Sequence, residues 1–252
     1  MHQAIIIISF LTFILPQYTA FAQENTPDWW QRPINVEKFV LPEDSHAQGK
    51  YLVQSLRQAG LPIHHVCARA VKNVDIVYGN KTMPDGTTIQ GWFPIPRANA
   101  WKPFERNSVE IPRIADVVQH YISEAGDYRL IFVKSQPVLV AETAISLCEK
   151  THFEPLDKKS VSIPDLAMAY STVLKGAGYG FSYGPGSSID VQFDFSFAGG
   201  DLIEFLCEIA ESLDSVYPDR LYVWEIEGIK DSHMLIGFGW RSREKLSELF
   251  LK

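Results

Sequence analysis

The residues of this chain that most resemble a catalytic set surround Ser182. Residues Gly180 to Gly184 read G-F-S-Y-G, the spacing in which a serine on a sharp strand-to-helix turn exposes its hydroxyl to a base. Asp219 and His233 follow in the order that such a triad requires. The flanks are reversed, because a helical pattern precedes the string and a strand pattern, Val191 to Phe197, follows it. We therefore interpret Ser182 as a loop or strand residue and assign no catalytic residue, and a secreted serine hydrolase using Ser182 is the alternative function.

Possible metal and phosphate ligands form two short clusters. His64, His65 and Cys67 are zinc-type ligands within four positions, but a zinc site needs a second pair at suitable spacing, and no C-x-x-C or H-x-x-x-H supplies it. The glycines between Gly176 and Gly180 fall at a helix end, whereas phosphate-binding loops lie at a helix start. We predict structural, hydrogen-bonded histidines, no metal and no cofactor.

Composition narrows the class of partner. The chain has 252 residues, is 46% hydrophobic and carries a net charge of −7. Nucleic acids and anionic membranes attract clustered lysines and arginines, so the acidic balance argues against both. Cys67, Cys148 and Cys207 make an odd set, not a disulfide framework. Cys148 and Cys207 are expected to be buried small hydrophobes, and a disulfide between them stays open.

The first residues indicate export. Ile5 to Leu15 is an apolar run too short to span a bilayer, and Ala20-Phe21-Ala22 is a small-x-small cleavage site. We interpret residues 1–22 as a signal peptide, with a retained anchor as the alternative, because the segment before the apolar run has no lysine or arginine. The mature protein is expected to be periplasmic or secreted, with no later membrane-spanning helix.

An internal repeat organises the rest of the chain. Ser108 to Gly126 and Ser160 to Gly178 lie 52 positions apart and are identical at seven of nineteen positions without a gap. The tripeptide Leu-Cys-Glu then recurs at residues 147–149 and 206–208. This similarity predicts a duplicated supersecondary unit, in which residues 108–150 and 160–211 share one fold.

Local patterns assign the elements of each copy. Apolar residues at three- and four-residue spacing predict helices that end near Gly126 and Gly178, and strict alternation predicts a strand over Val191 to Phe197. That strand should bury Phe193, Phe195 and Phe197 and expose the residues between them. A hairpin formed by Leu221 to Glu227 and Met234 to Trp240 closes the second copy, and Ser242 to Lys252 is expected to form a terminal helix.

We therefore predict an α+β fold of tandem small strand-helix-strand-strand-helix modules after an N-terminal α/β region. The expected division is a signal peptide (1–22), the N-terminal α/β region (23–107), a first module (108–158), and a second module with closing hairpin and terminal helix (159–252). Within the N-terminal region, the pattern predicts a helix over Gly49 to Gly60 and a hairpin with a long irregular connection over Asn73 to Arg106.

The second copy resembles a known family. The strings SIPDLAMAYSTVLKGAGYGFSY and IDVQFDFSFAGGDLIEFLCEIAESL, with the hairpin YVWEIEG and HMLIGF, are similar to the short N-terminal domain of secretins and TonB-dependent receptors. The first copy resembles the related tandem N-modules of secretins, so the resemblance covers about residues 108–240. It implies a free-standing carrier of such modules, because nothing after residue 240 could build a secretin or receptor barrel.

This resemblance implies a non-enzymatic docking or scaffold component of a bacterial envelope machine, such as a secretin-linked type IV pilus, a secretion channel or a conjugation system. The partner is expected to be an envelope protein, with no nucleic acid involved. We predict that Trp224, Phe238 and Trp240 of the closing hairpin contact it. The alternative is that all of these aromatic residues belong to the core, and this alternative weighs most for Trp224. A ligand-binding or inhibitor protein is a third function that the sequence leaves open.

Overall fold

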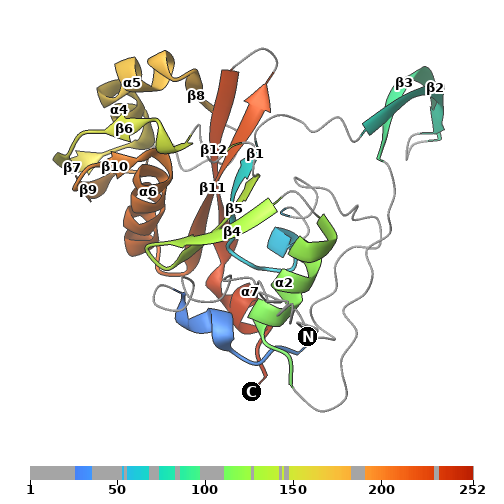
Figure 1. The fold of residues 1–252 in the computed structure, drawn as a ribbon, viewed down its shortest axis with the longest axis horizontal. Helices are drawn as coiled ribbons and strands as arrows, with labels where there is room; N and C mark the ends of the chain where they lie inside the picture. Colours follow the sequence, from blue (N-terminus) through green and yellow to red (C-terminus); the bar gives the residue numbers. More distant parts are fainter. Residues whose placement is uncertain are drawn as a thin grey trace, which may run out of the picture.

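The fold, seen in a computed structural model, belongs to the α+β class predicted from the sequence (Figure 1). The structure describes the following residues: 26–35, 53, 56–67, 74–82, 86–96, 111–125, 128–141, 144, 148–182, 191–229 and 233–251. The expected signal peptide, residues 1–22, lies outside them. No helix in the described part of the chain is both long and apolar enough to cross a membrane.

A six-stranded sheet forms the centre of the molecule, in the order β4-β5-β1-β11-β12-β8. Its strands are β1 (His64–Cys67), β4 (Tyr128–Val133), β5 (Gln136–Ala141), β8 (Tyr179–Ser182), β11 (Arg220–Ile229) and β12 (His233–Ser242). Strand β1 is parallel to both of its neighbours, and β12 is parallel to β8. The hairpins β4–β5 and β11–β12 are antiparallel.

This sheet takes strands from all three of the chain ranges that the sequence divides. Strand β1 comes from the range 23–107, β4 and β5 come from 108–158, and the other three strands come from 159–252. A strand of four residues must pair on both sides if it is to be buried with its backbone groups satisfied, and His64, His65 and Val66 are all buried. The N-terminal range therefore supplies a central strand of a shared sheet.

The repeat does not produce two copies of one fold. In the first copy, β4 pairs with β5 in a hairpin. In the second copy, β8 joins the edge of the central sheet beside β12, while the next strand, β9 (Phe193–Phe197), pairs with β7 (Leu156–Val161) in a different sheet. The order of helix, strand and strand is kept in the described residues, but the strand pairing differs. The expected superposition of the two ranges is wrong.

A two-stranded ribbon lies beside the central sheet. Its strands are β6 (His152–Phe153) with β10 (Gly200–Asp201), and β7 with β9. Both pairings have the same register, since Phe153 faces Gly200 and Leu156 faces Phe197. They therefore form one antiparallel ribbon with a gap at residues 154–155 and 198–199. Gly199 lies in this gap with a φ of +92°, a conformation that favours glycine.

The ribbon carries the aromatic core predicted from its alternation. Phe193, Phe195 and Phe197 are buried, whereas the intervening Asp194 and Ser196 are exposed, which confirms the predicted pattern. These rings pack against α6 (Leu202–Val216), which begins at a capping box formed by Asp201 and Glu204. Figure 1 shows α6 between the ribbon and the central sheet.

The helical segment before β8 is divided in two. The sequence predicts a single helix ending at Gly178, but the structure has α4 (Ile163–Ala169) and α5 (Ser171–Gly176) with a break at Tyr170. The Tyr170 hydroxyl donates a hydrogen bond to the carbonyl oxygen of Glu154, and its ring contacts Phe153 and Phe205. Tyr170 thereby fixes the break against the ribbon.

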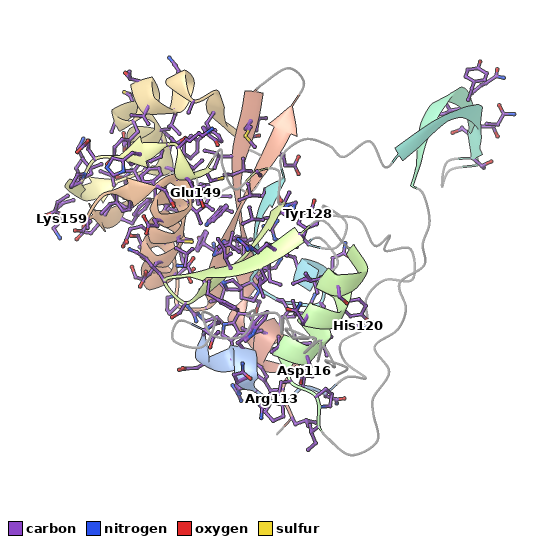
Figure 2. All side chains as sticks on the ribbon, viewed as in Figure 1. Arg113, Asp116, His120, Tyr128, Glu149 and Lys159 are labelled. Atoms are coloured by element: carbon purple, nitrogen blue, oxygen red, sulfur yellow. The ribbon has the colours of Figure 1, made fainter. Side chains whose placement is uncertain are left out.

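The opposite face of the sheet is covered by α2 (Ile114–Ala125), α7 (Arg243–Ser247) and a short 3-10 helix, η1 (Asp28–Gln31). At the start of α2, the Arg113 amide donates to an Asp116 carboxylate oxygen at 2.9 Å (Figure 2). The segment after η1 connects the residue pair before α2 with the residues after α7. Ile34 N donates to the Pro112 carbonyl and Asn35 N donates to the Leu249 carbonyl, each at 2.9 Å.

Two predictions for the N-terminal region are confirmed. Residues 53 and 56–58 are helical, and Gly60 after them has a φ of +106°, as expected for a glycine at a helix end. The predicted hairpin consists of β2 (Val74–Thr82) and β3 (Thr88–Pro96), which pair in their own two-stranded sheet. Its strands are joined by residues 83–87, a shorter connection than the long irregular one expected. Figure 1 shows this hairpin away from the central sheet.

Candidate functional site: the closing hairpin

The three residues predicted to contact a partner lie on one face of the β11–β12 hairpin. Trp224 is directly opposite Phe238, and Tyr222 is directly opposite Trp240. Because side chains alternate between faces along a strand, these four rings share one side of the sheet. Their exposure differs sharply along the hairpin, and this difference decides which of them could contact a partner.

Trp224 is part of the core, so its assignment to a partner contact is not supported. Its side chain is fully buried. The ring stacks on the imidazole of His64, with centroids 4.9 Å apart and an angle of 11° between the planes. The alternative stated for Trp224 is the one that the structure shows. Phe238 is half-buried and stacks against Phe181, with centroids 6.3 Å apart.

Trp240 is the exposed ring of this face, with 41% of its surface accessible. The guanidinium carbon of Arg220 lies 4.7 Å from the centroid of the Trp240 ring and 4.5 Å from that of Tyr217. Tyr222 is buried, and its ring is 6.3 Å from that of Tyr217. We call these four residues, Tyr217, Arg220, Tyr222 and Trp240, the aromatic–arginine site.

Sequence reasoning missed two members of this site, Tyr217 and Arg220. Tyr217 follows the last residue of α6 and Arg220 is the first residue of β11, two positions that the pattern of buried residues does not mark. The signal was present in the hairpin register, since Arg220 begins β11 opposite Ser242 and so lies beside Trp240. A cation next to an exposed indole makes a favourable contact of about 0.5–1 kcal/mol, which orders both side chains.

Asp214 supports the site from α6. Its carboxylate accepts a hydrogen bond from the Tyr222 amide at 2.6 Å, and Arg243 Nη2 lies 3.6 Å from its other oxygen. The carboxylate therefore ties the end of α6 to the start of β11 and to α7. Burial raises the pKa of Asp214 to about 6, with a smaller contribution from Glu211, although the Tyr222 amide and Arg243 act in the opposite direction.

This pKa predicts a pH-dependent stability that Asp214→Asn should remove. The folded-state pKa lies above the unfolded value, so the folded state binds the proton more tightly, and the contribution is fully present below about pH 4. This contribution is lost as the pH rises through about 6. The difference of about two units between the folded and unfolded pKa values corresponds to at most about 3 kcal/mol. The asparagine keeps the oxygen that accepts from Tyr222 but does not titrate.

Urea unfolding of both proteins at pH 4, 5, 6 and 7 measures the effect. The stability of the wild type relative to Asp214→Asn should fall between pH 4 and 7. His64, whose pKa is lowered to about 3 by burial, contributes in the opposite sense, because stability is lost as the pH falls below about 6.5. His64 is present in both proteins, so the difference cancels it. Parallel stability curves across this range would contradict the Asp214 assignment.

His64 is a structural, hydrogen-bonded residue, as the sequence analysis predicts. The Trp224 amide donates to His64 Nδ1 at 3.2 Å, which leaves the proton on Nε2 to donate to Gln136 Oε1 at 2.7 Å. Gln136 Nε2 in turn donates to the Cys207 carbonyl at 3.0 Å. This chain of bonds joins β11, β1, β5 and α6. Burial, helped by the nearby charge of Arg57, lowers the pKa of His64 to about 3 and so keeps the imidazole neutral, while the two hydrogen bonds leave neither nitrogen for a metal.

Arg57 makes a second buried connection between the N-terminal range and β11. Its side chain is 5% exposed and donates to the carbonyl oxygens of Ile63 and Trp224, each at 2.8 Å, and to Glu225 Oε2 at 2.6 Å. Glu225 balances the positive charge of the Arg57 guanidinium, and the three acceptors together use most of its N–H donors. Arg57 therefore fastens the helical residues 56–58 to the central sheet.

The structure does not bring Ser182 together with its proposed triad partners. Ser182 is exposed at the end of β8, opposite Gly237 of β12. Asp219 immediately precedes β11, whereas His233 pairs with Ile229 at the far end of the same hairpin. Ten residues of strand separate them, roughly 30 Å at the usual rise per residue. A hydrogen-bonded Ser-His-Asp set is impossible with this arrangement.

Cys148 and Cys207 are both buried and are not joined in a disulfide. Burial raises the pKa of the Cys148 thiol to about 12 and raises that of Cys207 further, which keeps both sulfurs protonated and unreactive. Their expected role as small buried hydrophobes agrees with this environment. Within the described ranges, no three histidine, cysteine or carboxylate side chains gather as a metal site would require.

Comparison with protein-family models, with curated proteins and with solved structures finds no match to this chain. Among the candidates raised by its sequence and structure, the aromatic–arginine site combines exposure with chemistry suited to binding.

Proposed function

We propose that this protein is an exported, non-enzymatic docking protein that binds a protein partner through the aromatic–arginine site. The observation that carries the proposal is the exposed Trp240 ring held beside Arg220 and Tyr217. Tryptophan, tyrosine and arginine are the residue types enriched at the energetic centres of protein interfaces. Here all three occur in contact at the surface.

The surroundings of the site favour a protein partner. Val216, next to Tyr217 at the end of α6, is 40% exposed and extends the apolar surface. The Trp240 side chain is held in place by Arg220, which lowers the entropy that binding must cost. An interface built on Trp240 would therefore gain from burying a large ring that is already ordered.

The cellular role follows from two features of the sequence. The pattern of residues 1–22 supports export, and the resemblance of residues 108–240 to secretin N-terminal domains supports a place in a bacterial envelope machine, such as a type IV pilus, secretion or conjugation system. Because the three chain ranges share one sheet, the proposed docking unit is the whole sheet with its closing hairpin, and not a single module.

Trp240→Ala should abolish co-purification of the envelope partner while leaving the protein folded. The substitution removes the exposed ring and its contact with Arg220, and we expect it to lower the free energy of unfolding by at most about 2 kcal/mol. Co-purification is measured with the tagged protein expressed in its own cells, and folding is checked by circular dichroism.

Met168→Ala is the matched control, because Met168 is 73% exposed on α4 and lies outside the aromatic–arginine site. It should retain the partner. Equal recovery of the partner by folded Trp240→Ala and by wild type would overturn the proposed function.

A further inference from the structure

Arg220 is held at the surface in a way that leaves its hydrogen-bonding capacity largely unused. Its contacts with Tyr217 and Trp240 stabilise the positive charge through the ring faces and consume no N–H donor. A hydrogen bond with Tyr222 is the main interaction that raises the pKa of Arg220, so the group stays charged. A guanidinium has five donors, and one such bond leaves most of them available.

Among the residues that the structure describes, no carboxylate satisfies the charge of Arg220 by a close hydrogen bond. Asp219 Oδ2 lies 3.8 Å from Arg220 Nε, which is longer than a hydrogen bond, and its side chain is 76% exposed. Arg220 Nε is buried and has no hydrogen-bond partner among the described residues.

The charge of the site is opposite to that of the chain. The protein carries a net charge of −7, yet its exposed aromatic surface is built around an arginine. A guanidinium beside aromatic rings is well suited to bind a carboxylate, with an apolar side chain of the same partner placed on the indole. A single-stranded nucleic acid also uses arginine and aromatic rings, but it needs a row of cations along its backbone, whereas the aromatic–arginine site holds one arginine.

We propose that the aromatic–arginine site recognises an acidic segment of its protein partner, in which a carboxylate pairs with Arg220 and a neighbouring apolar side chain packs on Trp240. This inference rests on the proposed function and specifies the chemistry of the partner. It makes Arg220 the residue that determines specificity and Trp240 the residue that supplies most of the buried area.

Two peptides test this recognition directly. One is a capped hexapeptide of alternating leucine and glutamate, and the other replaces each glutamate by glutamine. Binding is followed by NMR through the indole N–H signal of Trp240, which is assigned by its loss in Trp240→Phe. The glutamate peptide should give a saturable shift that weakens several-fold between 50 and 300 mM salt, and the glutamine peptide should bind at least about tenfold more weakly.

Variants separate Arg220 from the general charge of the surface. Arg220→Gln should abolish the shift, and Arg220→Lys, which keeps the charge but not the planar donors, should weaken it. Lys159→Gln, which removes a cation that is 79% exposed on the ribbon, should change nothing. The dispersion of the amide spectrum shows whether each variant is folded.

Several results would overturn the inference: equal binding of both peptides, a shift that persists in folded Arg220→Gln, no shift with millimolar glutamate peptide, or tighter binding of a ten-residue oligothymidylate. None of these outcomes affects the co-purification result for Trp240→Ala. A partner lost in that variant without any preference for glutamate would support docking and refute the acidic segment.

Discussion

Phe205→Ala is expected to lower the free energy of unfolding by about 3 to 5 kcal/mol, the usual cost of deleting a fully buried phenylalanine ring. Phe205 has no exposed surface and stacks on Phe153, with centroids 4.5 Å apart and planes 9° apart. Its edge contacts are with Phe195, Phe197 and Tyr170, at 5.8, 5.6 and 5.1 Å. The ring thus joins α6 to both strands of the ribbon and to the break between α4 and α5. Alanine at this position would leave a cavity, and the surrounding elements are held apart and cannot all move in to fill it.

Urea unfolding followed by circular dichroism at pH 7 measures this loss. Met168→Ala removes a side chain of similar length that is 73% exposed, and it should cost less than about 0.5 kcal/mol. A loss below about 1 kcal/mol for Phe205→Ala would show that the ribbon and α6 do not share the core described above.

Arg57→Met should cost about 3 kcal/mol or more, because it leaves buried groups without their partner. Methionine keeps most of the aliphatic volume, so the loss reports the guanidinium. Two carbonyl oxygens, of Ile63 and Trp224, lose a donor, and Glu225 loses the cation at 2.6 Å. Glu225 is 35% exposed and regains some hydration, which limits the cost of its own charge.

Lys159→Met is the matched control for the loss of an ion pair. Lys159 and Asp194 lie 3.0 Å apart, but their side chains are 79% and 63% exposed, and Figure 2 shows Lys159 at the outer side of the ribbon. A surface pair of this kind contributes about 0–1 kcal/mol. Equal losses for the two variants would contradict the view that Arg57 anchors the N-terminal range to the central sheet.

Local patterns in the sequence were sufficient to predict several elements of the fold. The spacing of apolar residues predicts the C-terminal end of α2, and the alternation around Phe195 predicts which side chains of β9 are buried. These predictions succeed because each depends on one element facing one apolar layer. The closing hairpin belongs to the same class, since its two strands are neighbours in sequence.

Strand pairing between distant segments could not be predicted. β1 lies between β5 and β11, and the contact of Arg57 with Glu225 joins residues 168 positions apart. A periodic pattern states that a strand has a buried face, but it does not name the strand beside it. The repeat led to a wrong expectation for the same reason. The residues that the two copies share specify a helix and its ends, but they do not specify whether the next strand pairs with the strand that follows it, as β4 does with β5, or with a distant strand, as β8 does with β12.

The candidate site was predicted in part. The sequence marks Trp240 as an aromatic residue on the hairpin. The exposure of Trp240 and the burial of Trp224 depend on how far α6 extends over that face and on the neighbouring strand β1, whose His64 stacks on Trp224. Arg220 and Tyr217 join the site through the turn between α6 and β11 and through the hairpin register. Neither relation is visible in composition or spacing.

Site-specific photo-crosslinking from position 240 tests the docking proposal most directly. A benzoylphenylalanine placed at position 240, in the protein expressed in its own cells, should give a discrete crosslinked product that is lost when Arg220 is changed to glutamine. The same group at the exposed position 168 should give no such product. Identical products from both positions, or a product at position 240 that is unaffected by folded Arg220→Gln, would contradict docking through the aromatic–arginine site.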